Sequence, residues 1–332
     1  MRPLAVSLGD PAGIGPELAA RAWIVRAELP PFFVVGDPGV MTRALERAGQ
    51  TPCVRIVKEP EPEDGDALQV IATPIATRET PGVPNADNAP SVIGAIAKGV
   101  ATVGAGKAAA LVTLPIAKSV LQAAGFGFPG HTEFIAHLTQ EAPWEGERGP
   151  IMLLAGPTLK VALATIHTPL AETPALLTRE RVTSTARVLG EALKRDFGIP
   201  QPRLALCGLN PHAGEDGAIG REEMDIINPA AAALRAEGWD ITDARSADAM
   251  FNDEARRSYD AAVALYHDQG LIPIKTLHFW EAVNVTLGLP IVRTSPDHGT
   301  GFDIAGKGVA RPDSFFAALR LANEIAERRA RA

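Results

Sequence analysis

The chain has 332 residues, 46% of them hydrophobic and 21% charged, so it can bury the core of one large domain or two medium ones. Its formal net charge of −7 argues against a nucleic-acid partner, and no stretch approaches the roughly 20 apolar residues of a membrane span. Cys53 and Cys207 form no CxxC pair, and residues 1–10 lack the apolar segment of a secretion signal. These features predict a cytoplasmic protein that binds neither nucleic acid nor membrane.

Short apolar runs alternate with amphipathic segments from the N-terminus onward. We predict strands at residues 4–8, 32–35, 54–57, 68–71 and 109–113. Helices are predicted between and after them at residues 16–29, 38–48, 90–103 and 132–139.

The alternation continues in the second part of the chain. Residues 151–154 and 161–166 flank Gly156-Pro157 and are predicted to form a β-hairpin. Further strands are predicted at residues 204–207 and 261–265, and helices at residues 178–197, 222–237 and 312–329. Strands that alternate with helices indicate an α/β fold with a largely parallel sheet.

The motif Gly9-Asp-Pro-Ala-Gly-Ile-Gly-Pro-Glu17 lies between a predicted strand and a predicted helix. Open α/β sheets bind ligands at this kind of position. Its glycines lack the GxGxxG spacing of the common dinucleotide fingerprint, so the motif is equally compatible with a simple turn into a helix.

Three of the seven histidines, His167, His212 and His267, lie just after predicted strands. The carboxyl ends of parallel strands meet at one edge of a sheet, and three neutral imidazoles there would form a metal site with an open position. No short ligand spacing such as HExxH is present, so each could instead be a hydrogen-bonded loop residue.

The segment Pro129-Gly-His131-Thr132-Glu133 stands at a predicted helix start. Backbone N–H groups there, with His131 and the Thr132 hydroxyl, would bind an anion. Thr132 would also serve as a helix N-cap, and the two roles are compatible.

Candidates for proton transfer come from two segments. Lys275 ends the run Tyr266-His-Asp-Gln-Gly-Leu-Ile-Pro-Ile-Lys275, where a lysine can exchange protons or bind phosphate. Asp268 in this run and Asp248 supply carboxylates. The alternatives are a lysine whose stem lies along apolar surface and an aspartate that caps a helix.

The run from Asn284 to Gly308 combines two features. An apolar segment ends in Arg293, a fixed cation suited to phosphate or carboxylate. The loop that follows is rich in polar residues and glycines, which let a backbone approach a ligand closely: His298, Gly299, Gly301, Asp303, Gly306 and Gly308. The alternative is a tight surface turn, although loops with clustered polar groups more often carry function.

Together these segments resemble the 4-hydroxythreonine-4-phosphate dehydrogenase family of pyridoxal phosphate biosynthesis. The region 299–311 is also similar to the cofactor loop of isopropylmalate and isocitrate dehydrogenases. One departure is Leu114, which with its neighbours is more apolar than the turn expected in this family. The matching stretches span nearly the whole chain: residues 9–17, 125–134, 161–170, 207–223, 247–251, 266–275 and 283–308.

The resemblance implies two α/β/α domains with a cleft between them, as in isopropylmalate dehydrogenase. We expect residues 1–128 and 275–332 in the domain with the nucleotide loop, and residues 129–274 in the domain with the metal histidines and the dimer interface. The family also implies a homodimer whose active site draws residues from both subunits.

The family's ligand sets fall on particular residues of this chain. A divalent metal, zinc, magnesium or cobalt, would be held by His167, His212 and His267. The phosphorylated amino-acid substrate would contact His131, Thr132, Lys275, Asn284 and Arg293. NAD or NADP is expected at His298, Gly299, Thr300, Gly301 and Asp303. The candidates for proton transfer are Lys275, Asp248 and Asp268.

The implied reaction is oxidation of 4-phosphohydroxy-L-threonine at C3, followed by decarboxylation to 3-amino-2-oxopropyl phosphate. Sister dehydrogenases that act on phosphorylated threonate or on an aromatic cis-dihydrodiol share these motifs. A metal-dependent hydrolase with three histidine ligands is the alternative from another enzyme class, and it would have no use for the loop at residues 298–308. A non-enzymatic binding protein would not need catalytic-type groups at several strand ends.

Overall fold

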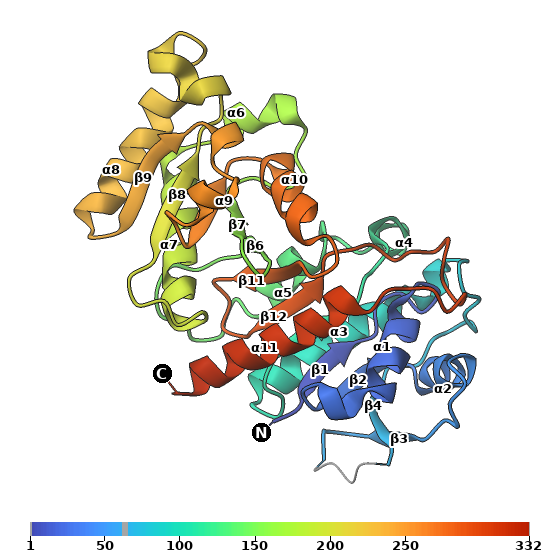
Figure 1. Cartoon of the computed structure of the whole chain (residues 1–332). Coiled ribbons are helices and arrows are strands. Elements are labelled where there is room, and N and C mark those ends of the chain that lie inside the picture. The colour runs from blue at the N-terminus through green and yellow to red at the C-terminus, as the bar shows by residue number, and fades with distance from the viewer. Residues whose placement is uncertain (1, 62–65, 332) are drawn as a thin grey trace. The chain divides into compact units, whose positions relative to one another are not determined.

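The computed structural model describes residues 2–61 and 66–331, and it has the expected α/β fold (Figure 1). The chain divides into two compact units. Unit 1 comprises Met1–Pro143 and Pro290–Glu327, and unit 2 comprises Trp144–Leu289 and Arg328–Ala332.

These borders differ from the expected domain limits for a physical reason. Helix α5 (His131–Leu138) buries Phe134 and Ile135 and packs with α3 (Ala89–Gly104), so residues 129–143 belong to unit 1. Strand β11 (Val283–Leu287) pairs with β6 (Ile151–Ala155), which keeps residues 275–289 in unit 2.

Unit 1 contains a parallel sheet with the strand order β3-β4-β2-β1-β5-β12. Parallel strands covered on both faces are apolar throughout, and β1, β2 and β5 are entirely buried. Their bounds are β1 Leu4–Ser7, β2 Phe32–Gly36, β3 Val54–Val57, β4 Leu68–Ala72, β5 Leu111–Thr113 and β12 Arg293–Pro296.

The helices of unit 1 start where the sequence supplies caps and prolines. Asp37 accepts a hydrogen bond of 2.7 Å from the N–H of Val40 and caps α2, which begins at Pro38. The first predicted helix ends earlier than expected, at Ile24, and a 3₁₀ turn follows. The remaining bounds are α1 Gly15–Ile24, α2 Pro38–Arg47, α4 Lys118–Ala123 and α11 Asp313–Arg331, with 3₁₀ turns at Arg26–Glu28 and Ala86–Asn88.

Unit 2 contains a mixed sheet with the order β11-β6-β7-β10-β8-β9. Strand β6 runs antiparallel to both β7 and β11, which confirms the predicted hairpin, and β7, β10, β8 and β9 are parallel. The polar edge strand β9 was not predicted. The bounds are β7 Lys160–Leu163, β8 Arg203–Cys207, β9 Asp240–Arg245 and β10 Ala261–Ala264.

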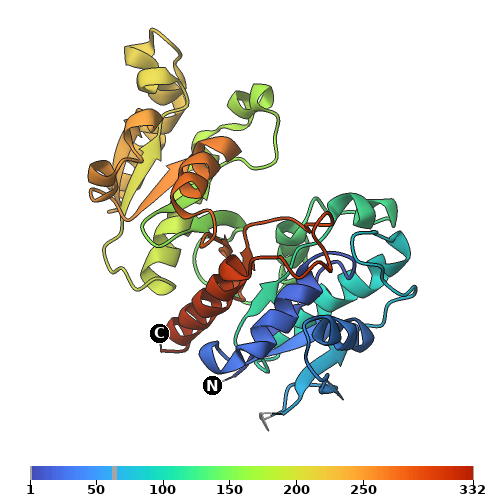
Figure 2. The same ribbon diagram turned by 45° about the vertical axis from the view of Figure 1, so that its right-hand side comes forward.

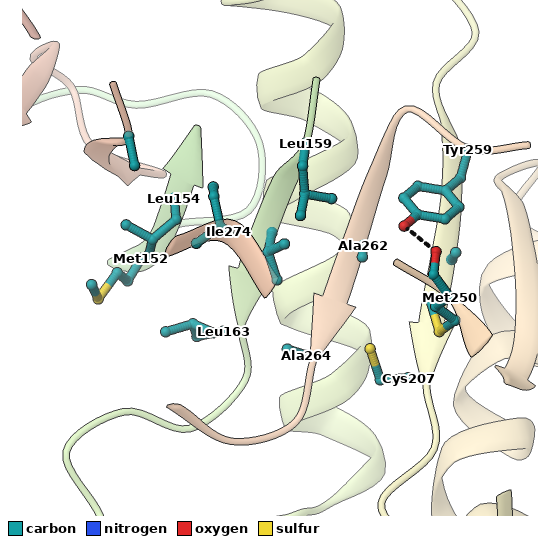
Figure 3. Packing of buried hydrophobic residues seen from close by; sticks show 13 residues of the cluster. Met152, Leu154, Leu159, Leu163, Cys207, Met250, Tyr259, Ala262, Ala264 and Ile274 are labelled. Carbon is teal, nitrogen blue, oxygen red and sulfur yellow. Dashed lines mark hydrogen bonds between the residues drawn. The ribbon is translucent and has the colours of Figure 1, made fainter. Parts of the chain in front are cut away.

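Helix α10 (His267–His278) was also missed, because Gly270 and Pro273 interrupt its helical pattern. It forms because Ile274 enters the buried cluster above the sheet, beside Leu154 and Leu163 (Figure 3). In the same cluster the Tyr259 hydroxyl donates to the Met250 carbonyl at 2.8 Å.

Helix α7 (Arg179–Arg195) packs against β6, β7 and β11, and α8 (Asn228–Ala236) lies beside β9 (Figure 1). A π-helical turn at Glu223–Ile227 leads into α8. No helix in the described part of the chain is long and apolar enough to cross a membrane. The bounds are α6 Thr173–Leu176, α7 Arg179–Arg195, α8 Asn228–Ala236 and α9 Asp253–Arg256, with 3₁₀ turns at Leu170–Glu172, Pro211–Gly217 and Ala247–Ala249.

Candidate active site

In unit 2 the three predicted metal ligands follow the carboxyl ends of parallel strands. His167 follows β7, His212 follows β8, and His267 is the first residue of α10 directly after β10. The buried side chain of Gln269 connects two of these strand ends. It accepts from the N–H of Leu265 and donates to the carbonyl of Gly208, each at 2.7 Å.

His167 and His267 lie side by side. Their ring centroids are 5.7 Å apart, and both line a pocket of about 300 Å³ together with Tyr266 and Asp268. Nδ1 of His267 is 2.7 Å from the Asp268 carboxylate. A histidine that donates Nδ1–H to a carboxylate presents Nε2 to a metal, so Asp268 is placed to orient a ligand.

His212 lies in a turn with left-handed backbone. Consecutive residues have positive φ: His212 (50°), Ala213 (52°), Gly214 (81°), Glu215 (43°) and Asp216 (52°). For residues other than glycine this conformation costs about 1–2 kcal/mol each.

His167 shares this feature, with φ of 49°. Within residues 2–61 and 66–331, positive φ outside glycine occurs only at His167 and within the His212 turn. Such strain persists where the surroundings enforce it, and it concentrates at functional sites. A purely structural loop histidine would not need it.

The three imidazoles are suitable donors for zinc or cobalt, and His267 has the supporting carboxylate such sites commonly use. The donor chemistry therefore fits a divalent metal. In the described part of one chain, however, no three His, Cys, Asp or Glu side chains lie close enough to hold one ion. The rings of His167 and His267 lie side by side, but the three histidines do not form a three-ligand group within the described part of one chain.

The remaining predicted residues of unit 2 have different surroundings. Asp248 is exposed; the Ser246 hydroxyl lowers the pKa of its carboxyl, and nearby His212 adds a smaller effect in the same direction. Lys275 is half-buried on α10, with Nζ 5.8 Å from the ring centroid of Phe279. On β11, Oδ1 of Asn284 is buried without a hydrogen-bond partner, so it can accept from a ligand.

Unit 1 places a buried cation at the end of its sheet. Arg293 on β12 is 3% exposed, and its guanidinium donates to the Thr113 hydroxyl at 2.7 and 3.2 Å. Burial lowers the pKa of Arg293 to about 10, and Glu133 opposes this shift. An arginine buried this deeply favours an anionic ligand.

His131 begins α5 in the same unit, followed by Thr132. Burial holds the pKa of His131 well below its usual value, with further lowering by Arg293 and Lys118. Its Nε2 is buried and has no hydrogen-bond partner. A neutral imidazole with a free ring nitrogen next to a buried arginine can complete an anion site at the helix start.

The loop between β12 and α11 is attached to the motif Gly9–Glu17. The N–H of Ala310 donates to the Glu17 carboxylate at 3.0 Å, and the N–H of Ile14 donates to the Thr300 carbonyl at 2.9 Å. Figure 2 shows this red loop passing the blue helix α1. The N-terminal motif is therefore a support for the predicted nucleotide loop.

Glycines shape this contact. Gly301 has φ of +54°, and a Cβ there would lie 3.1 Å from the side chain of Ile14. A Cβ on Gly13 would lie 2.9 Å from the Thr300 carbonyl, so that position excludes larger residues. Gly299 differs, because a Cβ there would meet nothing within 4 Å.

The two other predicted residues of the loop are polar. Nδ1 of His298 is 3.0 Å from the Gly299 carbonyl, and Asp303 is exposed. Motif reasoning missed Glu17, Gln269 and Glu223, whose side chains support the loops. An acidic or amide side chain that binds a distant loop leaves no local spacing signal.

Residues 28–322 match the protein family described as "Pyridoxal phosphate biosynthetic protein PdxA". The chain belongs to this family. It is 54% identical to a 4-hydroxythreonine-4-phosphate dehydrogenase from Maricaulis maris, with 99% of both chains covered. It is 52% identical to one from Caulobacter vibrioides, with 99% of this chain and 98% of that one covered.

Solved structures agree with this membership. The chain matches a 4-hydroxythreonine-4-phosphate dehydrogenase from Klebsiella pneumoniae with a TM-score of 0.86 and 38% identity over 98% of both chains. A terephthalate 1,2-cis-dihydrodiol dehydrogenase from Burkholderia xenovorans matches with a TM-score of 0.65 and 31% identity, over 97% of this chain and 98% of that one. The predicted family, fold and dehydrogenase class are confirmed, and the sister activities are not favoured.

Proposed function

We propose that this enzyme oxidises 4-phosphohydroxy-L-threonine at C3 with NAD or NADP and a divalent metal, then releases CO2 to give 3-amino-2-oxopropyl phosphate. The overall balance is substrate plus NAD(P)⁺ to product, CO2 and NAD(P)H. The observation that supports it most is the left-handed backbone of His167 and His212, which follow β7 and β8 on either side of β10. Strain at ligand-type residues favours a metal site over ordinary loops.

When bound, the metal would lower the pKa of the C3 hydroxyl, and the nicotinamide would accept the hydride. Arg293 would bind the phosphate or carboxylate as a bidentate donor, with neutral His131 and Thr132 at the start of α5. Asn284 would accept from a substrate N–H or O–H through its unpartnered Oδ1.

Lys275 would donate the proton that replaces the lost carboxylate, and Asp268 would orient His267. Asp248 lies near His212 and remains a second candidate for proton transfer. The nucleotide would lie against residues 298–303, where Gly299 leaves open space.

We further propose a cytoplasmic homodimer in which one active site uses residues of both subunits. Within residues 2–61 and 66–331 of one chain the three histidines do not form a three-ligand group, so a second copy can supply a missing ligand. Apolar side chains on and after α10 are also exposed, as interface residues would be in a single chain: Ile272, Leu277, Phe279 and Trp280.

The direct test is formation of reduced nicotinamide from 4-phosphohydroxy-L-threonine by metal-stripped protein, before and after zinc, cobalt or magnesium is restored. Phosphorylated threonate and an aromatic cis-dihydrodiol serve as parallel substrates. We expect turnover only with metal and highest for the phosphorylated amino acid. Turnover without metal, or with a sister substrate alone, would contradict the proposal.

The shared site has its own test. Chains carrying His212→Ala and His267→Ala are coexpressed, and the mixed dimer is isolated with two different tags. If one site combines His212 of one chain with His267 of the other, the mixed dimer has one intact site and regains activity. Continued inactivity of a correctly assembled mixed dimer would place all three ligands in one chain.

A further inference from the structure

Unit 2 contains a buried carboxylate that the proposed reaction does not use. Glu223 is 1% exposed and starts the π-helical turn before α8. No lysine, arginine or histidine in the described ranges forms an ion pair with it. A buried carboxylate without a cation must be stabilised by hydrogen-bond donors, and its donors show what it holds in place.

All donors to Glu223 come from the segment that leads to His212. Its Oε1 accepts the backbone N–H groups of Leu209 and Asn210, both at 2.7 Å. Its Oε2 accepts the Asn210 side-chain amide at 2.9 Å. One carboxylate therefore fixes the two residues between Gly208 and Pro211.

The same carboxylate also fits closely against the left-handed turn. A Cβ on Gly214 would lie 2.7 Å from Oε2 of Glu223, so the turn passes directly over this group. The N–H of Ala213 donates to the Asn210 carbonyl at 3.1 Å, which connects the turn to the residue that Glu223 holds. Glu223 thus holds the backbone of the segment that enters the strained turn and also lies against the turn itself.

We infer that Glu223 is a positioning residue for His212: it enforces the left-handed turn and so presents the imidazole for metal binding. The inference rests on the proposed function, because metal binding by His212 is part of that proposal. Hydrogen bonds to an ionised acceptor are stronger than those to a neutral one, which suits a group that must hold strained backbone. Without it, the turn is free to relax and His212 to leave its place.

The test measures metal affinity rather than turnover. Co²⁺ is titrated into metal-stripped protein by calorimetry, and the ligand-field absorption of the complex is recorded. Glu223→Leu removes every acceptor, and Glu223→Gln keeps one carbonyl oxygen for the two backbone donors. Glu222→Gln is the matched control, because Glu222 accepts from the Asn210 side chain (2.7 Å) and from Arg221 but from neither Leu209 nor the Asn210 backbone.

We expect roughly tenfold weaker Co²⁺ binding for Glu223→Gln and up to about a hundredfold for Glu223→Leu, with a changed absorption band. The Glu222→Gln control should stay within about twofold of the wild type. If the Leu variant does not fold, the Gln variant alone decides the matter.

Combination with His212→Ala separates positioning from general stability. On that background, loss of Glu223 should have no further effect on Co²⁺ affinity. Equal losses on both backgrounds would overturn the inference, as would wild-type affinity of the Glu223 variants. If His212→Ala itself leaves affinity unchanged, the proposed metal site fails as well, and that result is distinct from the other two.

Discussion

Units 1 and 2 both place left-handed backbone at predicted ligand-binding loops, but different residues adopt it. In the loop after β12, positive φ falls on Gly301, Gly306 and Gly308. In unit 2 it falls on His167 and on the His212 turn. Glycine adopts this conformation without steric strain, whereas a histidine must be held in it by its surroundings.

The comparison separates two ways to build a site. The predicted nucleotide loop of unit 1 obtains its shape from its own glycines and needs Glu17 mainly for attachment. The histidine turn of unit 2 obtains its shape from groups outside it, Glu223 above all. Replacing a left-handed residue by glycine in unit 2 should therefore preserve stability, whereas replacing a left-handed glycine in unit 1 should lower it.

The largest expected effect is that of His212→Gly. Glycine relieves the strain at φ of 50°, so the melting temperature should stay equal or rise. Metal affinity should fall by more than the roughly hundredfold typical of supporting residues, and turnover should be lost. Metal content, rate and a melting curve are the measurements.

Ala213→Gly is the matched control for His212→Gly. It relieves the same kind of strain at φ of 52° but removes no ligand. It should leave stability equal or raise it by up to about 1 kcal/mol, because the relieved strain of about 1–2 kcal/mol exceeds the entropic cost of glycine of roughly 0.5–1 kcal/mol, and it should keep turnover. Unchanged metal affinity in His212→Gly would contradict the proposal that His212 is a metal ligand.

Much of unit 2 could be predicted because its signals are local. The positions of the three histidines follow from apolar strands such as β8 and β10 and from the residues just after them. The sign of φ at His212 could not be predicted, because it depends on Glu223, more than ten residues away and on another element. Helix α10 was missed for a similar reason: tertiary packing of Ile274 outweighs the local effect of Pro273.

In unit 1 the residues of the proposed anion site could be recognised by type, but their surroundings could not be predicted. Arg293 is recognisable as a fixed cation, yet its burial and its bonds to Thr113 depend on the pairing of β12 with β5. The support of the nucleotide loop by Glu17 joins residues from opposite ends of the chain. Sequence spacing contains no signal for such contacts.

The second largest effect concerns Arg293→Lys. Lysine cannot reproduce a bidentate contact. The substitution also removes the two hydrogen bonds from Arg293 to Thr113, so the lysine ammonium is not fixed in the same place. We expect KM for the phosphorylated substrate to rise about tenfold to a hundredfold and KM for the nucleotide to stay unchanged. Steady-state kinetics with each reactant varied in turn would measure both. A rise confined to the nucleotide would contradict the assignment of Arg293 to the substrate.

The third effect tests the glycine loop. Gly299→Val adds a side chain where a Cβ meets nothing, so the melting point should be preserved. Nucleotide affinity should fall about tenfold if the nucleotide lies there, as one badly placed contact of about 1.4 kcal/mol would cause. Gly301→Val is the contrasting variant, because φ of +54° makes it strained and less stable. Calorimetric titration of nucleotide beside melting curves distinguishes them, and full affinity in Gly299→Val would move the nucleotide elsewhere.

The smallest effect is a pH dependence of stability that belongs to His131. Burial lowers the pKa of His131 in the folded chain, so the unfolded chain binds one more proton between that pKa and about 6.5. Stability should therefore fall as pH drops below about 6.5, by up to roughly 1.4 kcal/mol per pH unit. His131→Gln removes the titrating group. As the pH is lowered from 7.5 to 5.5, the melting temperature of the variant should therefore rise relative to that of the wild type, by about 2–4 °C for each kcal/mol of stability that the wild type loses. Thermal melts of both proteins across this range measure the difference. A parallel decline of the two would contradict the expectation, because it would mean that the folded chain protonates His131 as readily as the unfolded chain does.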